Sequence, residues 1–437
     1  MRGRRVNAFH RVAILAALLF CLFSTSALAQ RATPAQYRQW RNEIRRTLFI
    51  SATPPPLAPK SYGTFNPATG VIAERVTYGT EFGMRVPAIV YRPAAGGRHL
   101  PALIVVNGHG GDKYSWYSFY TGILYARAGA VVLTYDPIGE GERNPDRKSG
   151  TRLHDRVVNA PHYPQRLSGL MMTDVQQAVS YLRGRADVDR ARIAVLGYSM
   201  GSFVSALTGA IDPRIAVLLL SGGGDLDGPG GYWENSGKPM CQSIPWKSLS
   251  VLGDKAAVVY ALNQRRGPTL IMNGTRDTVV DIPGAHEQPF FDDLARRVEA
   301  ITGTRRNIFE TYWVKGASHR PSWVTRAGAL WLESKLHFPN WTGQSIQAMP
   351  ETHISEWAAR NHVYIDPGYV SQDREGGVMA LGVNIPGVPR AELNSVPEAV
   401  WVRQTNRFVY SAWVRHALAA EGIVGDAARK AMARPNK

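Results

Sequence analysis

Short apolar runs alternate with stretches of helical periodicity through the middle of the chain, and this alternation constrains the fold more than any other feature. In the clearest helical stretch, apolar residues recur along one face from Met171 to Leu182. Continuous apolar strands separated by amphipathic helices are typical of a parallel sheet covered on both faces. The sequence therefore predicts an α/β fold with a mostly parallel sheet and helices on both faces. The runs are Ala102–Val106, Val131–Tyr135, Ile193–Leu196, Ile215–Leu220, Thr269–Met272 and Ile308–Val314.

The N-terminal part of the chain has a different pattern. Within residues 30–69, Thr33 followed by Pro34 is a favourable helix start, and a proline-rich stretch after it indicates a linker. Two extended runs then follow, Val71–Tyr78 and Met84–Tyr91, and we expect them to form an antiparallel pair.

Residues 70–338 are expected to form the main α/β domain, with two additions to the simple alternation. An insertion rich in Gly, Pro and aromatic residues, about 221–267, separates two strand runs and is predicted to form a cap. Residues 339–437 are predicted to be an appendage that packs on the main domain and has a helix near its end, Phe408–Ala419. Segments this long are usually functional or carry structure of their own.

Residues 1–29 have the three parts of a secretory signal peptide. Arginines stand at the start, an apolar run covers Val12–Phe23, and Ala27-Leu28-Ala29 supplies a small-x-small cleavage pattern. An apolar run of this length is short for a membrane span. We therefore expect cleavage before Gln30, no stable membrane span afterwards, and a secreted or periplasmic protein.

The chain is strongly basic, with a formal net charge of +17, of which the four arginines of residues 1–29 contribute four and leave about +13. The basic residues are dispersed rather than gathered in a run or a nucleic-acid-binding module, so no nucleic-acid partner is expected. A basic surface suits polyanionic surroundings such as cell-wall or plant polymers. Of two cysteines, Cys21 lies in the predicted signal peptide, so Cys241 alone cannot form a disulfide framework.

The apolar run Ile193–Leu196 leads directly into Gly197-Tyr198-Ser199-Met200-Gly201, and a helical stretch follows. A sharp strand-to-helix turn of this kind presents a nucleophilic serine above the sheet, and the glycines are needed because side chains at those positions would collide. The following helix N-terminus would lie beneath a developing oxyanion. Ser199 is therefore the predicted nucleophile.

A nucleophilic serine needs a base, and the base needs an orienting acid. In this chain order both should follow the serine, each on a loop after a later strand. His319 follows the run Ile308–Val314 and is the predicted base. Asp277 follows the run Thr269–Met272 and is the preferred acid, with Asp225 and Asp281 as alternatives.

Two backbone amides are expected to stabilise the oxyanion. One belongs to Met200, which follows the nucleophile. The other should come from the glycine-rich loop after Ala102–Val106, where His109 is preferred and Gly110 is the alternative. The remaining histidines lack metal-ligand spacing, so neither a metal nor a cofactor is expected.

These motifs resemble the α/β-hydrolase superfamily, and the resemblance covers roughly Gly70 to Phe338. The sequence is similar to the branches that contain acetyl xylan esterases and dienelactone hydrolases. The resemblance implies an eight-stranded, mostly parallel sheet and ester hydrolysis through an acyl-enzyme. The residues that carry it are Asn107-Gly108-His109-Gly110-Gly111, the segment Tyr135–Arg143, Gly197-Tyr198-Ser199-Met200-Gly201, Asp277 and His319.

The loop from Asp136 to Arg143 is expected to be structural, with Arg143 paired to Glu140 or Glu142. The substrate pocket is predicted to be lined by aromatic side chains that could stack on a sugar or a phenolic acyl group, or else only pack the cap. These residues are Tyr198, Tyr232, Trp233 and Trp246.

The leading hypothesis is a secreted serine carboxylic-ester hydrolase that acts on a small-molecule or polysaccharide-linked ester, for example an acetylated or feruloylated polysaccharide. A peptidase of the prolyl oligopeptidase type shares the order of Ser, Asp and His, but residues 30–69 are too few for the N-terminal propeller of such enzymes. A non-catalytic binding protein with this fold would typically have lost the serine or the histidine. The sequence makes no prediction of the oligomeric state.

Overall fold

A nine-stranded sheet forms the centre of the computed structural model, which describes residues 31–156, 158–226, 241–279, 288–365, 377–382 and 384–432. The order across the sheet is β1-β2-β3-β5-β4-β6-β7-β8-β9. The strands are β1 (Lys60–Ala68), β2 (Val71–Gly79), β3 (Arg85–Pro93), β4 (Leu100–Val106), β5 (Val131–Tyr135), β6 (Val188–Tyr198), β7 (Val217–Ser221), β8 (Thr269–Gly274) and β9 (Glu310–Val314).

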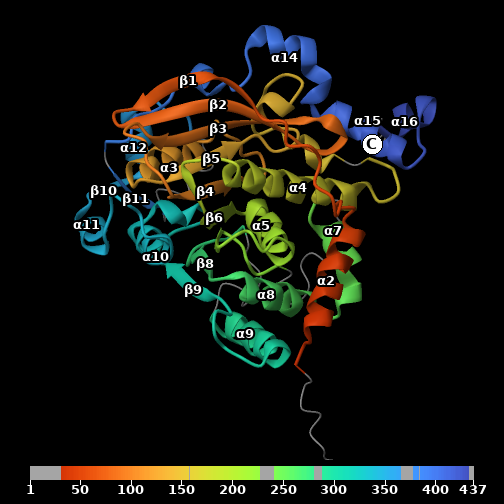
Figure 1. Ribbon diagram of the computed structural model, residues 1–437, viewed down its shortest axis with the longest axis horizontal. Coiled ribbons are helices and arrows are strands. Elements are labelled where there is room, and N and C mark those ends of the chain that lie inside the picture. Colours follow the sequence, from red (N-terminus) through yellow and green to blue (C-terminus); the bar gives the residue numbers. More distant parts are fainter. Residues whose placement is uncertain are drawn as a thin grey trace, which may run out of the picture.

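Helices cover both faces of this sheet, with α4, α5 and α8 in front of it in Figure 1 and α3 behind. Within the described residues, no helix is both long enough and apolar enough to cross a membrane. The helices are α2 (Pro34–Thr47), α3 (Trp116–Arg127), α4 (Tyr163–Arg183), α5 (Met200–Ile211), α7 (Ser243–Ser248), α8 (Lys255–Arg266), α9 (Gln288–Thr302), α10 (Arg326–Leu336), α11 (Gly343–Ala348), α12 (Ile354–Arg360), α14 (Glu398–Gln404), α15 (Tyr410–Ala420) and α16 (Gly425–Met432).

The strand β4 shows why its sequence is continuously apolar. Ala102, Ile104 and Val106 belong to the core shared with α4 and α5, whereas Leu103 and Val105 belong to the core shared with α3 and α10. Successive side chains of a strand point to opposite faces, so a strand covered on both faces needs apolar residues at every position. The predicted α/β fold is confirmed.

The sheet is mostly parallel, as predicted. The pairings from β5 across to β9 are parallel, and the predicted antiparallel pair of β2 and β3 is confirmed. One strand more than the eight implied by the resemblance is present, because β1 pairs antiparallel with β2 at the edge of the sheet. The strand β1 lies in the segment predicted to be a helix and a linker, and its residues are exposed or half-buried. An edge strand without an apolar run leaves no periodic signal in the sequence.

The predicted N-terminal helix is confirmed as α2. Its N-cap Thr33 accepts a hydrogen bond from the Gln36 amide, and the Gln36 side chain accepts one from the Thr33 amide. This reciprocal arrangement satisfies amides that the first turn of a helix leaves unpaired. Tyr37 and Ile44 are buried on one face of the helix.

The segment after residue 338 packs against helices on both faces of the sheet. It is the blue part of the ribbon in Figure 1. On one side, Trp357 of α12 packs against Tyr120 of α3, with 4.9 Å between ring centroids. On the other side, the Tyr410 hydroxyl of α15 hydrogen-bonds the Tyr163 hydroxyl of α4 at 2.5 Å. The helix predicted at Phe408–Ala419 corresponds to α15.

The loop after β5 is buried and connects segments that are far apart in the sequence. The Glu142 carboxylate lies 2.9 Å from the buried Lys113 ammonium and accepts hydrogen bonds from the amides of Ser395 and Val396. The predicted pairing of Arg143 with Glu140 or Glu142 is wrong, because Arg143 forms its ion pair with Asp174 of α4.

Glu81 lies on a short 3₁₀ turn, η1 (Glu81–Gly83), between β2 and β3. The Thr173 hydroxyl of α4 donates to its carboxylate at 3.4 Å. Burial, with the nearby Asp174 carboxylate, raises the pKa of Glu81 to about 7. The folded protein therefore keeps this proton up to about pH 7, whereas the unfolded chain loses it near pH 4.5. The free energy of unfolding should consequently fall as the pH rises between these values.

Glu81→Gln removes this dependence. We expect the variant to exceed the wild type in free energy of unfolding by about 1 to 3 kcal/mol at pH 8, and to match it near pH 4. Thermal unfolding at the two pH values measures the difference, with exposed Glu356→Gln of α12 as the control. Identical melting temperatures for Glu81→Gln and the wild type at pH 8 would show that Glu81 is not the titrating group.

Candidate active site

Ser199 occupies a sharp turn between the last residue of β6 and the first residue of α5. Its backbone has φ 54° and ψ −118°, which a residue with a side chain rarely adopts. Such strain is typical of functional positions held by their surroundings. The amide of Ser199 donates to the Ser221 carbonyl at the end of β7, which helps to hold the turn in place.

Neither glycine of the motif, Gly197 or Gly201, has room for a side chain, as predicted. A Cβ atom at Gly197 would lie 2.4 Å from the Gly201 carbonyl oxygen. A Cβ atom at Gly201 would lie 2.1 Å from the Val106 carbonyl oxygen of β4. The turn that exposes Ser199 therefore closes only when both positions lack a side chain.

His319 and Asp277 meet through a hydrogen bond of 2.9 Å between His319 Nδ1 and Asp277 Oδ2. Asp277 follows β8 and His319 follows β9, and both residues are buried. The other carboxylate oxygen of Asp277 accepts from the Val279 amide at 3.0 Å, which fixes the direction of the carboxylate. A carboxylate on Nδ1 leaves Nε2 of the imidazole as the nitrogen that can accept a proton, in the tautomer that a general base needs.

His319 and Ser199 both lie close to the residues that follow β7, at the carboxyl ends of the parallel strands. A Cβ atom at Gly222 would lie 2.9 Å from His319 Cε1, and one at Gly223 would lie 3.4 Å from the Ser199 carbonyl oxygen. Tyr198 packs beneath the imidazole, with 5.1 Å between the rings, and its hydroxyl donates to the His319 carbonyl at 3.0 Å.

Asp225 and Asp281 are the two other carboxylates predicted for this role. Asp225 is buried after β7, and its charge adds to the burial that raises the pKa of the Tyr260 phenol well above its ordinary range. Asp281 lies outside the described residues. Asp277 is the carboxylate hydrogen-bonded to His319 Nδ1, so the geometry favours Asp277 over Asp225.

The loop after β4 lies against the serine. A Cβ atom at Gly108, in the predicted glycine-rich loop, would lie 3.0 Å from the Cβ atom of Ser199, so the missing side chain permits the contact. Within the described residues, the His109 amide forms no backbone hydrogen bond. Met200 is the first residue of α5, and helix geometry leaves its amide unpaired. Both amides are thus suited to a developing negative charge.

The predicted aromatic pocket is only partly described. Trp246 has no exposed surface and packs against Phe203 of α5, with 6.0 Å between ring centroids. It thus matches the packing alternative rather than a pocket lining. Tyr232 and Trp233 lie outside the described residues. The end of the predicted cap, 221–267, contains α8, which packs against α5 and α9.

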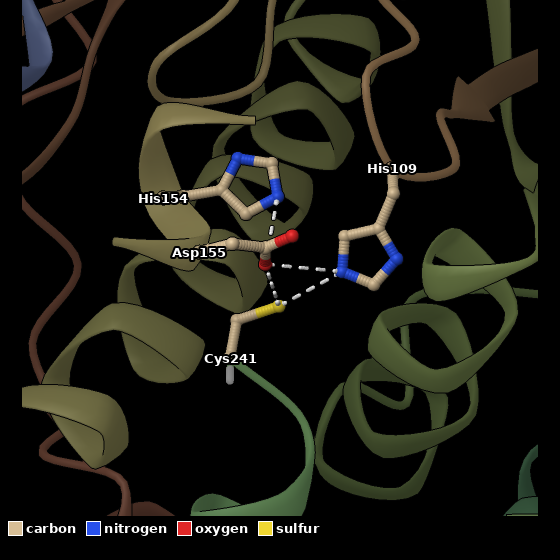
Figure 2. Close-up of side chains that lie close together, drawn as sticks. All are labelled: His109, His154, Asp155 and Cys241. Carbon is tan, nitrogen blue, oxygen red and sulfur yellow. Dashed lines mark hydrogen bonds and ion pairs between the residues drawn. The ribbon is translucent and has the colours of Figure 1, made fainter. Parts of the chain in front are cut away.

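The His109 side chain belongs to a second group of polar residues, with His154, Asp155 and Cys241 (Figure 2). This group was not predicted from the sequence, because its members come from three separate segments. Only adjacent His154 and Asp155 offered a local signal.

Comparisons with known proteins agree with the fold. A model described as the alpha/beta hydrolase family matches residues 103–375. An uncharacterized protein of Mycobacterium tuberculosis is 28% identical over 242 residues, which cover 55% of this chain and 72% of that protein. A solved methylesterase aligns with a TM-score of 0.57 at 18% identity, covering 95% of this chain and 78% of its own. Acetyl xylan esterase 1 from Thermoanaerobacterium aligns with a TM-score of 0.48 at 16% identity, covering 71% and 99%.

Proposed function

Because the chain belongs to the alpha/beta hydrolase family, we propose that it is a serine carboxylic-ester hydrolase whose catalytic triad is Ser199, His319 and Asp277. The observation that carries this proposal is the strained turn at Ser199 beside a histidine whose Nδ1 is hydrogen-bonded to a buried carboxylate. This combination provides a nucleophile, a base and an orienting acid on three loops that follow parallel strands of the sheet.

The reaction then proceeds in two halves. Ser199 Oγ attacks the ester carbonyl while His319 Nε2 takes its proton, and the same proton passes to the departing alcohol. Asp277 keeps the imidazole in the required tautomer and stabilises the imidazolium. In the second half, His319 removes a proton from water, which attacks the acyl-enzyme and releases the acid and Ser199.

The amides of Met200 and His109 are proposed to hold the oxyanion in both halves. Each is a fixed donor, so little reorganisation is needed as the negative charge develops. The loop glycine Gly108 supports this role, because its missing side chain lets the loop approach Ser199 closely.

We propose an acetyl ester of a polysaccharide as the substrate, with a feruloyl ester as the alternative. Gly108 and Gly222 let the backbone come close to Ser199 and His319, where a side chain would collide. The basic charge would keep the protein near polyanionic polymers. Export through the signal peptide Met1–Ala29 is part of the same proposal, and an N-terminus at Gln30 in the exported protein would support it.

A panel of p-nitrophenyl acetate, butyrate and octanoate tests the acyl preference. We expect hydrolysis of the acetate to exceed that of the octanoate at least tenfold in kcat/KM, as the proposed acetyl substrate requires. Release of acetate from acetylated xylan then tests the alcohol side. Faster cleavage of methyl ferulate than of the acetate would contradict the acetyl assignment, while leaving the ester chemistry intact.

A further inference from the structure

Four side chains with metal-binding atoms converge beside the candidate active site, and Figure 2 shows them pointing toward one another. His109 comes from the loop after β4, and Cys241 precedes α7. His154 and Asp155 come from a 3₁₀ turn, η3 (Leu153–Asp155). One donor atom from each lies within 4.8 Å of all the others. We propose that these four residues form a binding site for one zinc ion.

Three of the distances between the donor atoms match a tetrahedral site. His109 Nε2 lies 3.4 Å from Asp155 Oδ1 and 3.4 Å from Cys241 Sγ, and His154 Nε2 lies 3.7 Å from Asp155 Oδ1. With the usual zinc bond lengths, neighbouring donors of a tetrahedral site are about 3.3 to 3.8 Å apart. The separation of Cys241 Sγ from Asp155 Oδ1, at 4.0 Å, is slightly longer.

The His154 ring is already oriented as a ligand. Its Nδ1 lies 3.2 Å from the Ile138 carbonyl oxygen, which can only accept, so Nδ1 carries the proton and Nε2 has a free lone pair. Nε2 is buried and, among the described residues, has no hydrogen-bond partner. A buried, neutral nitrogen aimed at three other donors is the state in which histidine binds a metal.

The Asp155 carboxylate is also oriented by a hydrogen-bonding partner. Its Oδ2 accepts from the Arg152 guanidinium at 2.5 and 2.6 Å, which leaves Oδ1 directed at the two histidines and the cysteine. Hydrogen-bonded partners that orient the ligands are typical of metal sites. A thiolate, two imidazoles and one carboxylate form a donor set that suits zinc and is unlike the all-oxygen sets of calcium or magnesium.

A second catalytic triad does not explain the group. In a Cys-His-Asp triad, one ring nitrogen faces the thiol and the other faces the carboxylate. Here the same atom, His109 Nε2, faces both Cys241 Sγ and Asp155 Oδ1. The thiol is also buried. Zinc would bind it as the thiolate, with release of the proton.

The site ties together segments on which the proposed oxyanion amides depend. Cys241 Sγ touches the Met200 side chain at 3.5 Å, and His109 is itself the residue of the second amide. Four protein ligands leave no open position, as in structural zinc sites. The effect on hydrolysis rests on the proposed function, whereas zinc binding itself does not.

Metal content of the full chain tests the site. The protein is first stripped of metals with a chelator, then incubated with zinc and freed of the excess. We expect inductively coupled plasma mass spectrometry to find one zinc ion per chain. His154→Ala and Cys241→Ser should each lower bound zinc at least tenfold, while the exposed control His416→Gln keeps it. Ser199→Ala should bind zinc normally although it is inactive, which separates failure of the zinc site from failure of the proposed chemistry.

Cobalt(II) gives a second readout that needs no variant. Cobalt in the wild-type site should show the intense visible bands of tetrahedral coordination and a thiolate-to-cobalt charge-transfer band. The zinc proposal is overturned if the wild type binds no stoichiometric metal, if cobalt shows no thiolate band, or if the Cys241 and His154 variants bind zinc as the wild type does.

Discussion

Ser199→Ala is expected to lower kcat for p-nitrophenyl acetate by at least about 10³-fold, with little change in KM. The hydroxyl oxygen of Ser199 forms the acyl-enzyme. Without it, the variant keeps only the part of the rate enhancement that substrate binding and the oxyanion amides supply. Steady-state kinetics on the purified chain measure the loss. Alanine is compatible with the buried surroundings of the turn, and thermal unfolding checks that the variant is folded.

The matched control is Ser334→Ala, an exposed serine of α10 that lies outside the candidate site. Its rate should stay within twofold of the wild type. A Ser199→Ala variant that is folded and retains a tenth or more of the activity would show that another group is the nucleophile.

Asp277→Asn has the second largest expected effect, a loss of about 10² to 10⁴-fold in kcat. The amide is nearly the same size and can keep the hydrogen bond to the Val279 amide, so folding should be conserved. It has no charge to stabilise the imidazolium, and it permits the wrong tautomer of His319. Kinetics on p-nitrophenyl acetate over a range of pH measure the loss.

Parallel variants separate the three candidate acids. Asp225→Asn and Asp281→Asn should each remain within about fivefold of the wild type, since His319 Nδ1 is hydrogen-bonded to Asp277. A larger loss in either of them than in Asp277→Asn would transfer the role of the acid to that residue.

Much of the fold could be predicted because strands buried on both faces need continuous apolar runs. β4, β5 and β8 correspond closely to their predicted ranges for this reason. The edge strand β1 could not be predicted, since exposed pairing with β2 places no periodic demand on its side chains. The partner of Arg143 was missed because α4, which supplies Asp174, approaches the loop only in three dimensions.

The candidate site also contains residues that could be predicted from the sequence and residues that could not. The turn at Ser199 has a local steric signature in its two glycines, and the order of strands places Asp277 and His319 on neighbouring loops. The cluster of His109, His154, Asp155 and Cys241 has no comparable signature, because 132 residues separate its two ends. Only the folded chain brings these donors together.

Covalent labelling with a fluorophosphonate tests most directly whether Ser199 is an activated nucleophile. An activated serine oxygen displaces fluoride and forms a stable phosphonyl ester. We expect one adduct per chain, on Ser199 within the tryptic peptide Ile193–Arg214, formed at least about 100-fold more slowly in His319→Ala. A folded chain whose Ser199 stays unmodified, or whose label lies on another residue, would contradict the proposed triad.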